Sequence, residues 1–158
     1  MSKLPFFHLV KESSFKDKPS PLLVMVHGYG SNEEDLFSFA RALPSELTII
    51  SIRGPISVLG MGYAWYDISF DSFGNKTYNQ SQAIKSRDKI IECIDLCIET
   101  YNIDNKNISL MGFSQGAILI NAIAITYPKK VKNIISLSGG IDPNILKLSL
   151  DYLNKINF

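Results

Sequence analysis

The chain alternates short apolar runs with longer stretches in which apolar residues recur at helical spacing. Four runs have the length and residue types of buried strands, and turn residues bound them. They span residues 22–26, 47–52, 108–113 and 133–138. A weaker run over 6–10 is compatible with an additional edge strand. Continuous apolar strands are typical of sheets that are covered on both faces, so the pattern predicts a mostly parallel sheet.

Segments with helical periodicity lie between these strands. The first is expected to begin at Ser31, where Ser-x-x-Glu spacing to Glu34 is typical of a capping box, and to end at Pro44. Two others are predicted over 81–101 and 115–127. Asp142 followed by proline indicates a last helix through about residue 153. Strands alternating with helices predict an α/β fold with a doubly wound sheet.

Residues 56–80 show no sustained period. They contain several glycines and an aromatic cluster formed by Tyr63, Trp65 and Tyr66. We therefore expect a long loop, and loops of that length in compact domains are often functional.

Composition narrows the function classes. The 158 residues are 46% hydrophobic and 20% charged, which fits one globular domain over 1–158. Sixteen basic against fifteen acidic residues give a net charge of +1. Such a balance does not favour nucleic acid, so a small-molecule partner is expected. We find no signal peptide or membrane span and expect a cytoplasmic protein. Cys93 and Cys97 are expected to be reduced core thiols rather than a metal pair.

One segment carries the strongest chemical signal. Gly112-Phe113-Ser114-Gln115-Gly116 matches the G-x-S-x-G pattern and lies between an apolar strand and an apolar helix. This is the context of a nucleophile elbow, in which small residues two before and two after the serine let strand and helix come close. The pattern favours Ser114 as a nucleophile, with the Gln115 N–H stabilising an oxyanion. The alternative is a strand-to-helix turn with a serine that only caps the helix.

A second glycine turn, His27-Gly28-Tyr29-Gly30, follows the strand at 22–26. In α/β-hydrolases the corresponding loop supplies a second oxyanion N–H, and Tyr29 is the candidate here. The alternative is a plain strand-to-helix turn. His27 precedes the serine, so we expect it to order the loop rather than to act as the general base.

The segments LVMVHGYGSNEEDL (23–36), GYAWYDI (62–68), GFSQGA (112–117) and SLSGG (136–140) resemble the phospholipase/carboxylesterase family of α/β-hydrolases, which includes the acyl-protein thioesterases. The resemblance implies hydrolysis of acyl esters or thioesters without a cofactor or metal. It implies that Ser114 is the nucleophile, that Tyr29 and Gln115 donate the oxyanion N–H groups, and that Trp65 lies in a segment that helps wall the acyl site.

The sequence departs from this family after residue 140. Family members continue through two further strands that carry an Asp and then a His of the triad, whereas no histidine follows Ser114 here, and the only acids after it are Asp142 and Asp151. We therefore expect a partial α/β-hydrolase fold that lacks its last strands. Loss of a triad His costs on the order of a millionfold in turnover, so the chain alone should be nearly inactive.

Three functions remain to be compared. The first is a serine carboxylesterase or thioesterase whose Asp and His come from a missing C-terminal segment or a second chain. The second is a catalytically silent domain that binds an acyl ligand or a partner. The third is a dinucleotide-binding module, which is disfavoured because Glu33 stands where the fingerprint needs its third glycine.

Overall fold

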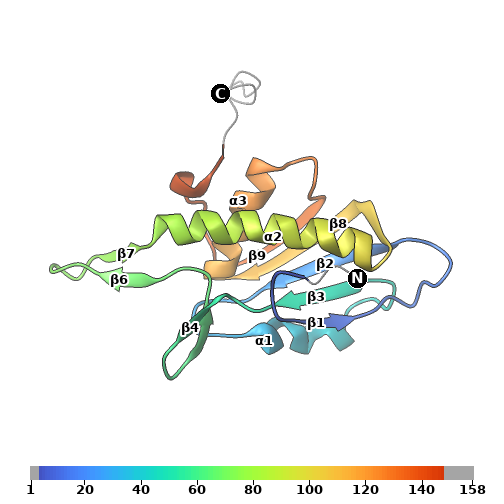
Figure 1. The fold of residues 1–158 in the computed structure, drawn as a ribbon, viewed down its shortest axis with the longest axis horizontal. Coiled ribbons are helices and arrows are strands. Elements are labelled where there is room, and N and C mark those ends of the chain that lie inside the picture. Colours follow the sequence, from blue (N-terminus) through green and yellow to red (C-terminus); the bar gives the residue numbers. More distant parts are fainter. Residues whose placement is uncertain (1–3, 148–158) are drawn as a thin grey trace, which may run out of the picture.

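The computed structural model describes residues 4–147 and shows one five-stranded sheet with helices on both faces (Figure 1). The strand order is β1-β3-β2-β8-β9. Only β1 runs antiparallel to its neighbour; the other pairs are parallel. The predicted α/β class with a mostly parallel, doubly wound sheet is therefore confirmed. The sheet strands are β1 (His8–Lys11), β2 (Ser20–Val26), β3 (Thr48–Ile52), β8 (Ile103–Phe113) and β9 (Asn133–Leu137).

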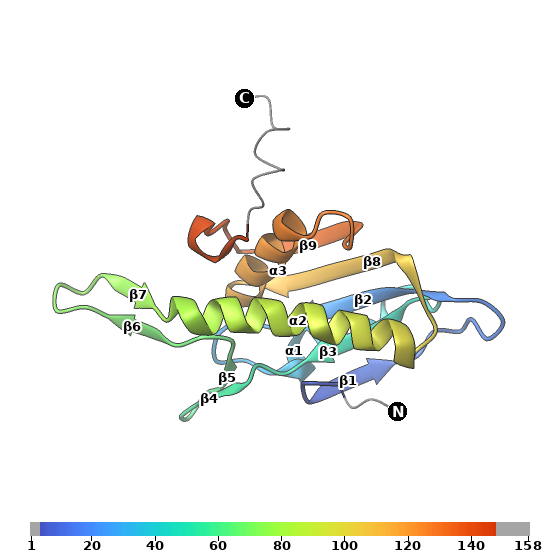
Figure 2. The ribbon, with the colours of Figure 1, turned by 45° about the horizontal axis from the view of Figure 1, so that its top comes forward.

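Alternation along the central strands divides the core between two faces. Leu22, Val24 and Val26 of β2 point to one face, which α2 (Gln80–Thr100) and α3 (Gln115–Thr126) cover (Figure 2). Leu23 and Met25 point to the other, beneath α1 (Glu33–Phe37) and the 3₁₀-helix η1 (Ser38–Arg41). Burial on both sides explains why these strands read as continuous apolar runs.

The N-cap of the first helix lies one residue later than predicted. Asn32, not Ser31, is the N-cap, and its side chain accepts a hydrogen bond from the Glu34 N–H. The Ser31 hydroxyl donates to the Asp35 carboxylate instead. Asparagine and serine cap helices about equally well, so the sequence pattern could not distinguish them.

The prediction of one long loop over 56–80 is wrong, because much of this segment is paired in strands. The segment folds into two hairpins, one from β4 (Ile56–Val58) and β5 (Gly62–Ala64), the other from β6 (Ile68–Phe70) and β7 (Lys76–Tyr78). The second hairpin extends outward beyond the N-terminal end of α2 (Figure 1). Strands of three residues are too short to show a period.

The last predicted helix is also corrected. Asp142 does act as an N-cap through its side chain, but it opens only the 3₁₀-helix η2 (Pro143–Ile145). The remainder of the predicted helix, after residue 147, lies outside the described residues. Within 4–147, none of the helices combines the length and apolar character needed to cross a bilayer.

Candidate active site

Ser114 lies in the sharp turn that joins β8 to α3. Its backbone has φ 49° and ψ −111°, a conformation that residues with a side chain seldom adopt. The Ser114 N–H is held by the Leu137 carbonyl of the neighbouring strand, and its own carbonyl accepts from Ile118 of α3. The expected tight turn is therefore present.

Two glycines make this turn possible. A Cβ atom on Gly116 would lie 2.1 Å from the Val26 carbonyl oxygen, and one on Gly112 would lie 2.8 Å from the Ala117 nitrogen. Both approaches are to backbone atoms, which cannot move aside easily. The small residues at these positions thus let α3 begin directly against β2 and β8.

The Ser114 side chain does not cap its helix. It makes no capping hydrogen bond to α3, and it borders a cavity of about 400 Å³. The structural alternative of a capping serine is therefore wrong. Ser114 is instead one of the residues that line the cavity.

Tyr29 and Gln115 border the same cavity as Ser114. Gln115 is the first residue of α3, where an N–H has no partner inside the helix. The Tyr29 N–H donates no backbone hydrogen bond within residues 4–147, although the next N–H, that of Gly30, is bound to the Tyr63 carbonyl at 2.8 Å. A Cβ on Gly28 would lie 2.9 Å from the Phe113 ring, so the two loops adjoin.

His27 is fully buried, and both of its ring nitrogens are engaged. Nδ1 lies 2.7 Å from the Gly28 carbonyl oxygen, and Nε2 accepts the Gly54 N–H at 2.9 Å. This arrangement fixes the neutral tautomer with hydrogen on Nδ1. Burial lowers the pKa of His27 below its ordinary value. The side chain thus ties the loop after β2 to the end of β3 and has no nitrogen left to take a proton from Ser114.

Trp65 does not itself line the cavity, although Tyr66 and Ile68 of the same segment do. Its side chain is fully buried, stacks edge-on against Phe6, and donates its indole N–H to the His27 carbonyl at 2.8 Å. Its neighbour Tyr66 borders the cavity instead. Large rings often fill cores, and here the residue after Trp65 carries the ring that lines the cavity.

The Gln115 side chain has a role that the sequence did not suggest. Its Oε1 accepts the Trp65 N–H and its Nε2 donates to the Tyr66 carbonyl, each at 2.8 Å. The amide thus fastens the aromatic segment to the first turn of α3. The sequence carries no signal for this contact, because the burial of the Gln115 side chain, at 2% exposure, is seen only in the structure.

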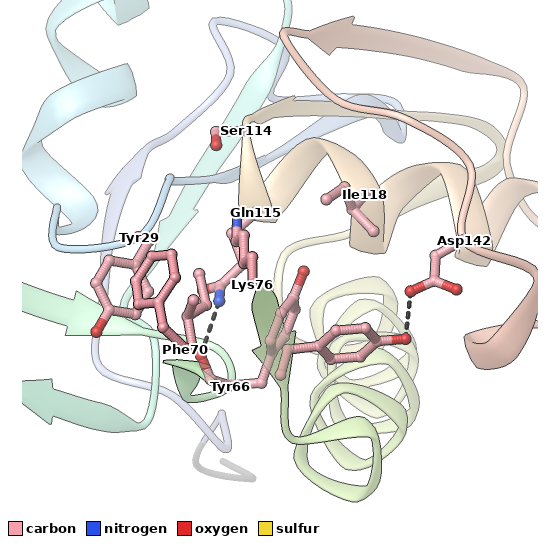
Figure 3. A pocket seen from close by; sticks show the side chains of 10 residues that line it. Tyr29, Tyr66, Phe70, Lys76, Ser114, Gln115, Ile118 and Asp142 are labelled. Atoms are coloured by element: carbon pink, nitrogen blue, oxygen red, sulfur yellow. Dashed lines mark hydrogen bonds between the residues drawn. The ribbon is translucent and has the colours of Figure 1, made fainter. Parts of the chain in front are cut away.

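Figure 3 shows the cavity, whose walls come from several separate parts of the chain. The second hairpin, the elbow and the start of η2 contribute Ile68, Phe70, Lys76, Tyr78, Ile118 and Asp142. The Tyr78 hydroxyl donates to the Asp142 carboxylate, which joins the hairpin to η2. Burial, together with this bond, raises the pKa of Tyr78 to about 12. The cavity is therefore mainly apolar, with a polar contact at one end.

Comparisons with known proteins identify the family of this chain. A family model described as Phospholipase/Carboxylesterase matches residues 10–149. The Uncharacterized hydrolase UM10204 of Mycosarcoma maydis is 25% identical over 149 residues, which cover 88% of this chain and 55% of that protein. The chain spans about half the length of this and a second curated relative, at 55% and 54%.

Solved structures share the fold. The carboxylesterase of Bacillus cereus superposes with a TM-score of 0.64 at 25% identity, covering 82% of this chain and 58% of that one. Esterase PE8 superposes with a TM-score of 0.70 at 24% identity, covering 89% and 66%.

Proposed function

Since this chain belongs to the phospholipase/carboxylesterase family of hydrolases, we propose that it carries the nucleophile and oxyanion half of a serine hydrolase that acts on acyl esters or thioesters. Ser114 is the nucleophile, and the N–H groups of Tyr29 and Gln115 are the oxyanion donors. The observation that carries the proposal is the strained backbone of Ser114, a residue that makes no capping hydrogen bond and lines the cavity.

The chemistry has two steps. Ser114 Oγ attacks the acyl carbon and gives its proton to a general base, while the carbonyl oxygen becomes an oxyanion between the two N–H groups. The tetrahedral species then expels an alcohol or thiol, which is protonated by that same base acting as an acid. Water cleaves the resulting acyl-serine and restores the hydroxyl.

The proposed reaction needs a general base that the described residues around Ser114 do not supply. No histidine follows Ser114 in the sequence. His27 is fully engaged, and both His8 nitrogens also contact protein oxygens, those of Phe6 and Tyr101. The proposal therefore requires an Asp and a His from a further segment or a second chain. The partner is a small acyl compound, and the proposed location is the cytoplasm.

A catalytically silent acyl-binding domain is the second candidate. The engagement of both histidines favours it, because a serine without a base is a weak nucleophile. A fluorophosphonate probe separates the two, since it labels only an activated serine. We expect faint labelling of the 158-residue chain, none of Ser114→Ala, and strong labelling when an Asp- and His-bearing segment of a family member is added. Labelling that persists in Ser114→Ala, or no gain on complementation, would contradict the hydrolase.

A further inference from the structure

Tyr66 carries a hydroxyl that the proposed chemistry does not use. The residue is only 5% exposed and borders the same cavity as Ser114. Its main chain is held at the carbonyl by Gln115, and its ring contacts the Tyr78 ring with centroids 5.4 Å apart. Contacts of the main chain and of the ring therefore hold the Tyr66 side chain in place.

The hydroxyl itself has no hydrogen-bond partner among residues 4–147. No fully enclosed side-chain polar atom in that part of the chain lacks a partner, so the hydroxyl must border open space. Figure 3 shows the Tyr66 side chain reaching into the cavity on the side of Gln115 and Ile118. A donor that faces the cavity is free to bond an oxygen of a bound ligand in place of water.

Of the other polar side chains that line the cavity, Tyr78 and Asp142 are bound to each other, and Lys76 carries a positive charge. The Tyr78 hydroxyl is bound to Asp142, so it does not compete for a ligand. Burial raises the pKa of Tyr66, and the nearby Asp142 carboxylate raises it further. Tyr66 is therefore a neutral donor at physiological pH. Asp142 would repel an anionic group that a ligand placed at this end of the cavity.

We propose that Tyr66 is a specificity-determining residue whose hydroxyl donates a hydrogen bond to a neutral oxygen on the acyl chain. The cavity would then favour oxo- or hydroxy-substituted acyl groups over saturated ones of equal length. The inference rests on the proposed function, because it takes the Ser114 cavity as the acyl site. A site that hydrogen-bonds a ligand oxygen discriminates against the analogue that lacks it.

The experiment measures binding of acyl acids and does not depend on turnover. Dissociation constants of hexanoate, 4-oxohexanoate and 5-oxohexanoate are measured by ligand-detected NMR on the Ser114→Ala chain. At least one oxo acid should bind about three- to tenfold more tightly than hexanoate, as expected for one net hydrogen bond. In the Ser114→Ala/Tyr66→Phe double variant this preference should disappear while hexanoate affinity stays the same.

Tyr127→Phe is the matched control, because it removes a hydroxyl that does not border the cavity. It should keep the preference. An oxo preference that survives Tyr66→Phe, or equal binding of all three acids, would overturn the role of Tyr66 and leave the hydrolase proposal intact. If the three acids do not compete for one site on the protein, the cavity is not an acyl site, and both proposals fail.

Discussion

At the scale of single residues, Ser114 combines a role at the cavity with a backbone conformation that costs about 1–3 kcal/mol. Glycine adopts such a conformation without the penalty. The cost is borne because the bonds to Leu137 and Ile118 hold the turn in place. A strained residue at a candidate site is thus explained by its surroundings rather than by its own preference.

This strain predicts an unusual order of stabilities. Ser114→Gly should be more stable than Ser114→Ala by about 1 kcal/mol, since only glycine relieves the positive φ. Free energies of unfolding in urea measure the difference. Glu92, exposed in the middle of α2, is the control, because there glycine should be less stable than alanine by about 1 kcal/mol. The same order at both positions would show that Ser114 is not strained.

The Gln115 amide gives a second residue-scale prediction. Gln115→Leu should lower the free energy of unfolding by about 2–4 kcal/mol, because the Trp65 N–H and the Tyr66 carbonyl are left buried without partners. Thermal and urea unfolding followed by circular dichroism measure this loss.

Gln82 provides the matched comparison. Its amide also makes two hydrogen bonds, both to Asp67, but in an exposed position. Gln82→Leu should therefore cost less than about 1 kcal/mol, because water replaces the lost partners. Equal losses for the two variants would contradict a special role of Gln115.

At the scale of elements, the apolar runs located the central strands and the helices between them. Burial on both faces leaves a clear signal, as in β2 and β3. The hairpins at 56–78 left none, because their strands are three residues long and partly exposed. The elbow could be recognised because its glycines are required by backbone contact. The burial of Trp65 could not, because it depends on how the segment after β5 packs against Gln115 and His27.

His27 links the loop after β2 to the end of β3. Its titration should therefore change the free energy of unfolding with pH. Its pKa is depressed in the folded protein, mainly by burial, so below the ordinary value of 6.5 the unfolded chain binds the additional proton. The free energy of unfolding should be highest above that pH and fall as the pH decreases. One proton limits the slope to about 1.4 kcal/mol per pH unit.

Urea unfolding at several pH values tests this expectation. His27→Gln removes the titration and should be less stable at pH 8 but less pH-dependent between pH 7 and 5. Glu33, whose pKa is lowered by its hydrogen bond from Arg53, contributes only at lower pH, near and below 4.5. An unchanged slope in His27→Gln would place the titrating group elsewhere.

At the scale of the whole molecule, β9 forms one edge of the described sheet. Its residues are all exposed, and Ile134, Ile135 and Leu137 are 42%, 44% and 37% accessible. Such an edge offers unpaired backbone groups next to apolar side chains, which is a template for pairing with another strand. The edge is also where an added segment of the proposed hydrolase would join.

The exposed edge predicts concentration-dependent self-association of the 158-residue chain. Ile135→Lys should raise the dissociation constant at least about tenfold, because charged edge residues oppose strand pairing. Sedimentation velocity measures it. Leu59→Lys is the control, since that side chain is 99% exposed in the turn of the first hairpin and should change nothing. Equal effects of both substitutions would point to general solubility rather than to β9.

Trp65 has a consequence for how the molecule can be observed. It is the single tryptophan of the chain, it is fully buried, and its ring centre lies 5.2 Å from that of His27. Its emission therefore arises from one place, where the elbow, the loop after β2 and the segment of Trp65 and Tyr66 meet. A red shift would report the arrival of water there, and quenching by an imidazolium would report the protonation of His27. The protein thus contains an intrinsic optical reporter of its own candidate site, and no attached dye is needed.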